Sequence, residues 1–366
     1  MTPASTTSPS SPITRPSPAS SSPPLRFKRA ALPQALALLS LILTGSGCHA
    51  LVAHHAYQPP NRQPLLKHLT LPDEERDQPE GSEPLRVELD NGVTLHADLY
   101  APLPLKPGRG HDRDRLALVL HTYAHSARQP ALRPWIQAFR EAGYTVLAPD
   151  LPGHGRSSPT RPTFGPREAQ CIAALLNHLE EKSSGTVNRP LVLFGISYGA
   201  TTALYLTAYP ELLDRSIALI TLAPFADPNA AIASYSRHAA HPWLLLTPSS
   251  WIAAAARSRQ EAAIRAGDRR QLNEHGGRTT YGIPFGNQAP FSVAPKLPPA
   301  LPWLILHGLN DRHAPPSNAQ ALFDARPQNT TLELIPDRDH HSLLLSPEAY
   351  LIPRVLQFIR DAHNPR

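Results

Sequence analysis

From residue 85 onward, short apolar segments alternate with stretches of helical periodicity. Residues 85–89 and 94–100 flank Asp90-Asn91-Gly92, a turn sequence, and predict an opening β-hairpin. Continuous apolar runs then predict strands covered on both faces, at 116–121, 144–148, 191–194, 216–222 and 303–306. Helices are predicted at 134–142, 166–181, 199–208 and 347–362. This alternation indicates an α/β fold, a mostly parallel sheet with helices on both faces.

The N-terminal part of the chain has a different pattern, in which an apolar run at 30–43 follows Leu25-Arg26-Phe27-Lys28-Arg29. The run is too short to span a bilayer core of about 30 Å comfortably. A basic segment before a short apolar run is typical of an export signal peptide. The run ends in Thr44-Gly45-Ser46-Gly47-Cys48, which resembles a bacterial lipobox, although Gly45 occupies the position where Leu is usual.

These features predict a signal peptide at 1–48 and a tether at 49–84, where no periodicity is sustained. The folded domain is predicted at 85–366. If Cys48 is lipidated, the protein is an exported lipoprotein, tethered to a membrane of the bacterial cell envelope. An uncleaved signal anchor and cleavage after a small residue such as Ala50 stay open as alternatives, and both also export the protein.

The net charge of +6 on 366 residues does not indicate a nucleic-acid partner. Arg15, Arg26, Lys28 and Arg29 supply most of the excess, and no acidic residue precedes Cys48, so the remainder is nearly neutral. With only two cysteines, one of them in the lipobox-like segment, a disulfide framework is excluded. Cys171 lies in a predicted helix and is expected to be a small buried apolar residue.

The best candidate nucleophile is Ser197, in Gly195-Ile196-Ser197-Tyr198-Gly199. This Gly-x-Ser-x-Gly motif stands between a predicted buried strand and a predicted helix. A sharp strand-to-helix turn exposes the serine hydroxyl at the carboxyl edge of a sheet, and the glycines remove Cβ atoms that would collide. We therefore predict that Ser197 is a nucleophile.

A serine nucleophile needs a base and an orienting acid, which this chain offers in the order Ser-Asp-His. Asp311 lies in the loop after the strand that begins at Trp303. Two adjacent histidines, His340 and His341, follow the last predicted strand. We predict His340 as the base, with His341 as the alternative, and Asp311 as the acid.

At this point the sequence resembles the α/β-hydrolase superfamily, from residue 85 to 362. The segment 148–157, Ala-Pro-Asp-Leu-Pro-Gly-His-Gly-Arg-Ser, resembles the Asp-x-x-Gly-His-Gly-x-Ser loop of capped serine hydrolases in the serine-aminopeptidase-like and monoacylglycerol-lipase-like group. The resemblance implies an eight-stranded, mostly parallel sheet with a helical cap insertion. It also implies that His154 is structural and not the base.

The expected oxyanion hole departs from the family pattern. After the first buried strand such enzymes usually carry His-Gly, whereas this chain has His121-Thr122-Tyr123-Ala124-His125. The backbone N–H groups of Tyr123 and Tyr198 are the predicted donors. An alternative is that the Tyr123 hydroxyl itself donates, and the structural alternative is that Tyr123 only lines the core or the pocket.

The long segment at about 226–298 exceeds what a connection between two strands needs and is the predicted cap. Residues 230–240 and 251–266 within it look helical, and its aromatic residues favour an apolar acyl group. No metal-binding, phosphate-binding or dinucleotide motif is present in the sequence, so neither a cofactor nor a metal is predicted.

The sequence thus predicts a serine hydrolase of the carboxylesterase or lipase type, acting on a small-molecule ester or a lipid. Three alternatives stay open: an acyltransferase, an aminopeptidase-like peptidase on the same triad, and a non-catalytic membrane-tethered binding protein.

Overall fold

The computed structural model describes residues 58–62, 77–104, 115–182, 187–239, 255, 258, 259, 262, 288–345 and 347–363. The chain divides into two units, Met1–Gly45 and Ser46–Arg366, and all described residues belong to the second. The predicted signal peptide, Cys48 and most of the tether and cap lie outside the described residues. Among the described residues, no helix combines the length and the apolar character needed to cross a membrane.

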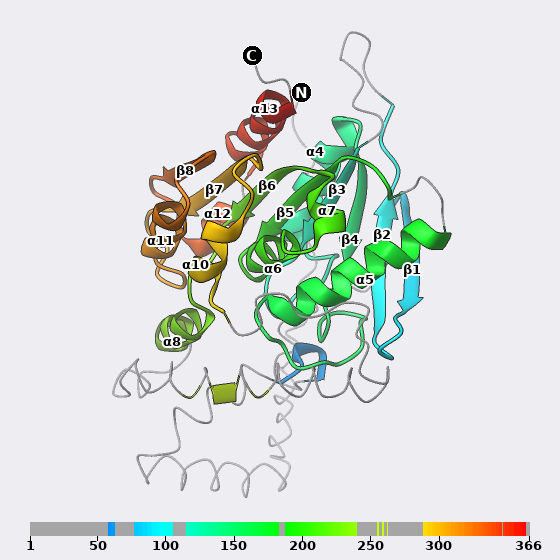
Figure 1. The fold of residues 1–366 in the computed structure, drawn as a ribbon, viewed down its shortest axis with the longest axis horizontal. Coiled ribbons are helices and arrows are strands. Elements are labelled where there is room, and N and C mark those ends of the chain that lie inside the picture. The colour runs from blue at the N-terminus through cyan, green and yellow to red at the C-terminus, as the bar shows by residue number, and fades with distance from the viewer. Residues whose placement is uncertain are drawn as a thin grey trace, which may run out of the picture. The chain divides into compact units, whose positions relative to one another are not determined.

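The described residues form an eight-stranded sheet in the order β1-β2-β4-β3-β5-β6-β7-β8 (Figure 1). β1 and β2 are an antiparallel hairpin, β2 pairs antiparallel with β4, and all further pairs are parallel. The predicted mostly parallel sheet is confirmed. The strands are β1 (Ser82–Glu88), β2 (Thr94–Tyr100), β3 (Leu116–Leu120), β4 (Thr145–Pro149), β5 (Leu191–Ile196), β6 (Ser216–Leu222), β7 (Trp303–Gly308) and β8 (Thr330–Ile335).

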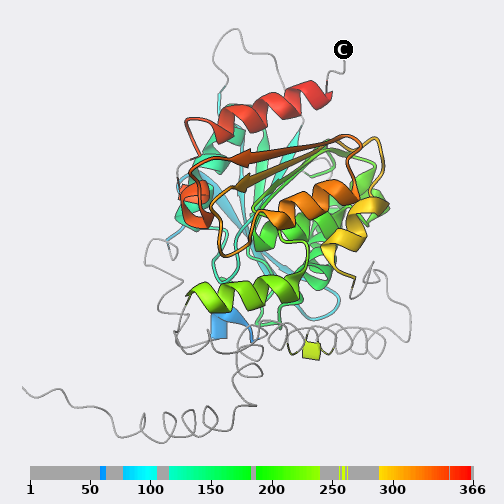
Figure 2. The same ribbon diagram turned by 90° about the vertical axis from the view of Figure 1, so that its left-hand side faces the viewer.

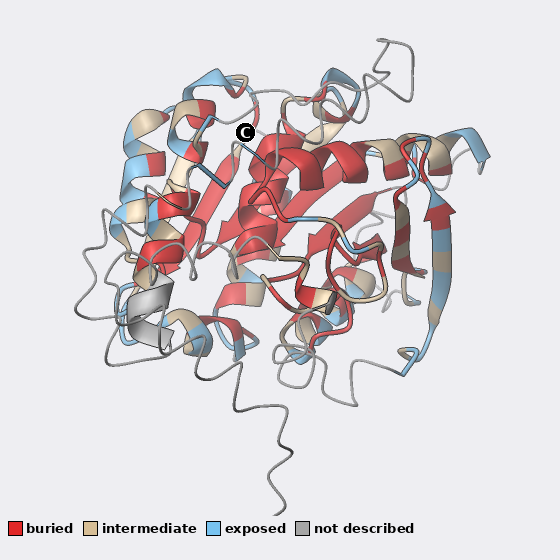
Figure 3. Ribbon diagram, turned by 90° about the horizontal axis from the view of Figure 1, so that it is seen from below, coloured by how far each residue is buried: buried red, intermediate tan, exposed pale blue. Residues whose placement is uncertain are grey.

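Helices cover both faces of this sheet, and the side chains of its central strands alternate between two apolar clusters. In β3, Leu118 belongs to the cluster under α5 (Pro166–Lys182), α6 (Tyr198–Leu206) and α11 (Ser317–Ala325). Val119 belongs to the cluster under α4 (Arg133–Glu141) and α13 (Leu351–His363). Figure 2 shows α13 on one side of the sheet and α11 on the other. The central strands are buried, and the edge strand β1 is largely exposed (Figure 3). Burial on both faces explains why the central strands are continuous apolar runs.

The predicted helices form, with ends that shift by a few residues. The last helix was expected from residue 347 and begins at Leu351, because residues 348–350 form a turn. The helices are α4 (Arg133–Glu141), α5 (Pro166–Lys182), α6 (Tyr198–Leu206), α7 (Pro210–Leu213), α8 (Pro228–Ala239), α10 (Pro290–Val293), α11 (Ser317–Ala325), α12 (His340–Leu345) and α13 (Leu351–His363), with short 3-10 turns η1 (Pro60–Arg62), η3 (Pro130–Leu132) and η5 (Ala294–Lys296).

The predicted cap is described only at its two ends. α8 contains most of the helix expected at 230–240, while α10 and η5 lead back to the sheet. Of the helix expected at 251–266, only residues 255, 258, 259 and 262 are described.

Candidate active site

Ser197 lies in a strained turn between β5 and α6. Its backbone adopts φ 53° and ψ −108°, a conformation that L-residues rarely occupy. A Cβ atom on Gly195 would lie 2.2 Å from the carbonyl oxygen of Gly199, and one on Gly199 would lie 2.4 Å from that of Leu120. Both glycines of the motif are therefore required by close backbone approach, as expected for a nucleophile turn.

Asp311, in the loop after β7, is buried and its carboxylate is fully hydrogen-bonded. The backbone N–H groups of His313 and Ala314 donate to Oδ1 at 2.9 and 2.8 Å. His340 Nδ1 donates to Oδ2 at 2.6 Å, and His307 Nε2 lies 3.4 Å from the same oxygen. Burial alone would raise the pKa of Asp311, but the hydrogen bonds from His307, His340 and Ala314 hold it below its ordinary value.

Of the two adjacent histidines, His340 contacts the acid. Its side chain is 14% exposed and faces Asp311, whereas His341 is exposed. Because Nδ1 of a neutral His340 would carry the proton in this hydrogen bond, Nε2 would have a free lone pair to accept another. The loops that carry the pair also bind each other, since Asn310 N–H donates to Arg338 O at 2.9 Å.

The three predicted residues follow strands β5, β7 and β8, which run parallel within one sheet. The carboxyl ends of parallel strands lie at the same edge, so Ser197, Asp311 and His340 come from loops on that edge. Other strained residues share it. The non-glycine residues with positive φ after these and neighbouring strands are Ala124, Phe164, Ala223 and Asp337. Strain of this kind is typical of functional sites.

The loop after β3 is fixed by a buried neutral histidine. Leu151 N–H donates to His121 Nε2 at 2.9 Å, so Nδ1 carries the proton and donates to Thr122 O at 2.7 Å. Burial lowers the pKa of His121 to about 3. Ala124 has φ 62°, a left-handed conformation that glycine adopts more readily than alanine, and it turns the chain at this point of the loop.

The side chains of the two predicted oxyanion donors pack against each other. The ring centroids of Tyr123 and Tyr198 are 5.5 Å apart. Phe164 contacts both, at 5.4 and 5.3 Å, and so does His154, at 5.5 and 5.0 Å. His154 is buried and its pKa is lowered by that burial to about 3, so it is a neutral part of this ring cluster.

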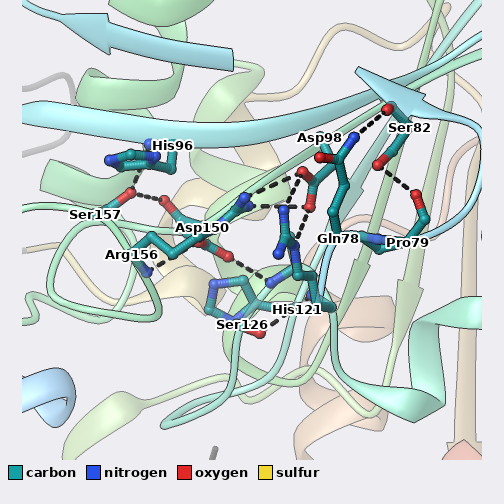
Figure 4. Close-up of polar contacts among 12 residues, drawn as sticks. Gln78, Pro79, Ser82, His96, Asp98, His121, Ser126, Asp150, Arg156 and Ser157 are labelled. Carbon is teal, nitrogen blue, oxygen red and sulfur yellow. Dashed lines mark hydrogen bonds and ion pairs between the residues drawn. The ribbon is translucent and has the colours of Figure 1, made fainter. Parts of the chain in front are cut away.

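A buried charge network adjoins the loop after β3, and its residues were not among the predicted site residues. Asp98 on β2 accepts from Arg128 at 2.8 and 2.9 Å and from Arg156 at 3.1 and 3.0 Å. Arg156 also binds Asp150 at 2.7 Å, and Asp150 accepts from the N–H of Ala127 (Figure 4). The sequence held one indication of this network, because Asp98 is a charged residue in the middle of the predicted strand 94–100. A carboxylate that is buried in such a strand requires a cationic partner.

Within the described ranges, no group of three histidine, cysteine or acidic side chains could hold a metal ion. Cys171 is buried in α5, and this burial raises the pKa of its thiol to about 11. A thiol with such a pKa stays protonated at neutral pH and is a poor nucleophile.

Comparison with known proteins identifies the family. A profile of the alpha/beta hydrolase family matches residues 107–351. The structure is similar to an esterase of Pyrococcus furiosus, with TM-score 0.54 and 17% identity over 79% of this chain and 94% of that chain. It is also similar to DcsB, solved with a substrate analogue, with TM-score 0.52 and 14% identity over 77% of this chain and 99% of that chain.

An esterase of Thermogutta terrifontis gives TM-score 0.48 and 19% identity over 77% of this chain and 100% of that chain. The two similarities with TM-scores above 0.5 concern the fold alone, because the sequence identities are low. No curated protein sequence is significantly similar to this one. Because the family profile covers most of the chain, this protein belongs to the alpha/beta hydrolase family.

Proposed function

We propose that this protein is a serine hydrolase that cleaves carboxylic esters through an acyl-enzyme on Ser197. The observation that supports this most strongly is the 2.6 Å hydrogen bond from His340 Nδ1 to the buried Asp311 carboxylate, at the edge of the sheet where the strained Ser197 lies. An oriented histidine and a serine held in a strand-to-helix turn are the two parts that nucleophilic catalysis requires.

In the acylation step, His340 Nε2 removes the proton of Ser197 Oγ while Oγ attacks the carbonyl carbon of the ester. The carbonyl electron pair moves onto oxygen and forms a tetrahedral oxyanion. When the intermediate collapses, the bond to the alcohol oxygen breaks and His340 returns the proton to the departing alcohol. Asp311 holds the imidazole in the required tautomer and stabilises its cationic form.

In deacylation, His340 takes a proton from water, whose oxygen attacks the acyl carbon. The second oxyanion collapses, Ser197 Oγ leaves and regains the proton, and a carboxylic acid is released. The N–H groups of Tyr123 and Tyr198 are the proposed oxyanion donors in both steps, and donors of this kind commonly contribute about 2.7–4 kcal/mol each.

The proposed substrate is a small-molecule ester or a lipid with an apolar acyl group. Support comes from the ring cluster next to Ser197 and from the aromatic residues of the predicted cap. The esterases of similar fold are consistent with ester chemistry. The finer assignment to the monoacylglycerol-lipase-like group rests on the Asp-x-x-Gly-His-Gly-x-Ser segment.

We propose further that the enzyme is exported and attached to a membrane through lipid on Cys48. The support is the basic segment, the short apolar run and the lipobox-like residues 44–48. Metabolic labelling with a radioactive fatty acid in a bacterial host should mark the wild type and not Cys48→Ser. Labelling of both proteins, or of neither, would contradict this attachment.

The catalytic proposal is tested by a fluorophosphonate probe, which reacts with activated serines. We expect the folded wild type to be labelled and Ser197→Ala to remain unlabelled at equal thermal stability. A panel of esters of increasing acyl length then defines the substrate class, and adding acceptor alcohols or aminoacyl amides separates hydrolysis from acyl transfer and peptidase activity. A folded wild type that is neither labelled nor active on any ester would refute the enzyme assignment.

A further inference from the structure

In the loop after β3, Thr122 stands where the pattern of the resembled family has glycine, and its side chain makes a contact. Thr122 Oγ1 donates to Gln129 Oε1 at 2.8 Å, and both residues are buried. Gln129 lies at the end of this same loop, directly before η3. The contact therefore closes the loop that contains Tyr123, one of the proposed oxyanion donors.

This contact acts on the peptide that presents Tyr123 N–H. In a trans peptide, the carbonyl of one residue and the N–H of the next point in opposite directions. Thr122 O accepts from His121 Nδ1 at 2.7 Å, so the direction of its carbonyl fixes the direction of Tyr123 N–H. The N–H of His125 also donates to Thr122 O, at 3.4 Å. Both polar groups of Thr122 are thus held, its carbonyl by His121 and His125 and its hydroxyl by Gln129.

Gln129 is a costly residue at this position. Its Nε2 is buried and has no hydrogen-bond partner in the part of the chain that the structure describes, and a buried amide left without a partner destabilises the folded state. The segment that it begins, η3, packs against α12, whose first residue is His340. Leu132 of η3 and Leu343 of α12 lie in one apolar cluster. Gln129 thus joins the loop of the oxyanion donor to the helix of the base.

We propose that Gln129 is a positioning residue, which orients the Tyr123 N–H through Thr122 and so replaces the shape that glycine gives this loop in relatives. The proposal rests on the proposed hydrolase function. It implies that the amide is retained for transition-state geometry and not for stability. Removing the amide should therefore lower turnover without lowering stability.

The test measures kcat, KM and the thermal midpoint for an ester that the wild type hydrolyses. In Gln129→Leu we expect kcat to fall roughly tenfold or more, because small displacements of an oxyanion donor are costly. KM should stay unchanged. The thermal midpoint should change little, because leucine removes the unpartnered Nε2 while the Thr122 hydroxyl loses its acceptor. Thr122→Val should show the same loss of kcat, the double variant no greater loss, and Thr122→Ser a recovery.

A matched control is Thr145→Val, which removes the hydrogen bond that Arg189 Nη1 donates to Thr145 Oγ1 at 2.8 Å. Thr145 is the first residue of β4 and lies at the amino end of the parallel strands, opposite the edge that carries Ser197, so the variant should lower the thermal midpoint and keep kcat. An active wild type whose kcat survives Gln129→Leu would overturn the positioning role, as would losses that multiply in the double variant. A wild type without probe labelling or ester turnover would instead remove the hydrolase function, and this proposal with it.

Discussion

The two halves of the candidate site are held in place by different forces. In the acid–base half, formed by Asp311 and His340, a buried carboxylate accepts hydrogen bonds on both of its oxygens, and its charge orients the histidine. In the oxyanion half, residues 121–125, neutral groups hold the loop in place. They are the imidazole of His121, the Thr122–Gln129 hydrogen bond and the rings around Tyr123. The charges that support this half lie beneath it, at Asp98 and Arg128.

This difference indicates how each half should fail. In the acid–base half, one carboxylate, that of Asp311, orients one imidazole, that of His340. The loss of either side chain therefore removes the function of the pair. A loop held by several neutral contacts should respond to each change by a smaller amount. The predictions below test this contrast, from the largest expected effect to the smallest.

The strongest test separates the two adjacent histidines. We expect His340→Ala to lower kcat roughly 10⁴-fold or more, because the serine loses the base that takes its proton. His341→Ala should change kcat little, since this side chain is exposed and the Asp311 bond belongs to His340. Steady-state kinetics on one ester measure both variants. A larger loss in His341→Ala than in His340→Ala would exchange their roles.

The second test removes the charge beneath the oxyanion half. Asp98→Asn leaves the buried Arg128 and the partly buried Arg156 without this carboxylate. Breaking a buried ion pair on one side costs about 3–5 kcal/mol of unfolding free energy. Urea unfolding measures the loss, with Glu333→Gln as a control, because its pair with Arg354 is more exposed and should cost about 1 kcal/mol or less. Equal losses in both variants would contradict the importance of burial.

The third test uses a lower pH to destabilise the oxyanion half through its buried neutral histidines. Burial lowers the pKa values of His121 and His154 to about 3, so at pH 5 both stay neutral in the folded protein and become protonated in the unfolded chain. The unfolded state then binds more protons, and stability falls as pH drops from 7 to 5, by about 2 kcal/mol for each histidine. Asp311 has a lowered pKa, so its stabilising contribution persists at pH 5 and is lost only in stronger acid.

Urea unfolding at the two pH values measures this loss. His154→Phe should remove the part of the pH dependence that His154 contributes, about 2 kcal/mol between pH 7 and pH 5, while keeping a ring in the cluster. An undiminished dependence in that variant would show that other groups titrate over this range.

The sheet could be predicted from the sequence more directly than the arrangement of the oxyanion half, for physical reasons. Strands buried on both faces must be apolar, so β3 and β5 were recognisable from composition alone. Asp311 could be placed by its position after β7. His340 was preferred to His341 for its place in the loop after the last strand. In the structure it is His340 Nδ1 that donates to Asp311, and neighbouring residues at the start of a helix point in different directions.

The oxyanion half depends on contacts between segments that are distant in sequence. The bond from Leu151 N–H to His121 joins residues 30 positions apart, and no local pattern indicates it. Asp98 and Arg128 are likewise separated by 30 positions. Where glycine is missing, the shape of a loop is set by such tertiary contacts, so the motif alone could not predict how residues 121–125 are held.

The smallest effect is expected from Tyr123→Phe, which tests whether Tyr123 contributes its backbone N–H or its side-chain hydroxyl to the oxyanion half. Its ring stacks on Phe164 and meets Tyr198 edge-on, and it packs against the apolar core, so we expect packing and the backbone N–H to be its contributions. Tyr123→Phe keeps both and should leave kcat nearly unchanged, whereas Tyr123→Ala should lower kcat and the thermal midpoint together. Steady-state kinetics and thermal unfolding measure the pair. A loss of kcat of roughly tenfold or more in Tyr123→Phe, at unchanged stability, would assign the hydroxyl as an oxyanion donor. The oxyanion half would then depend on a single polar group, as the acid–base half does.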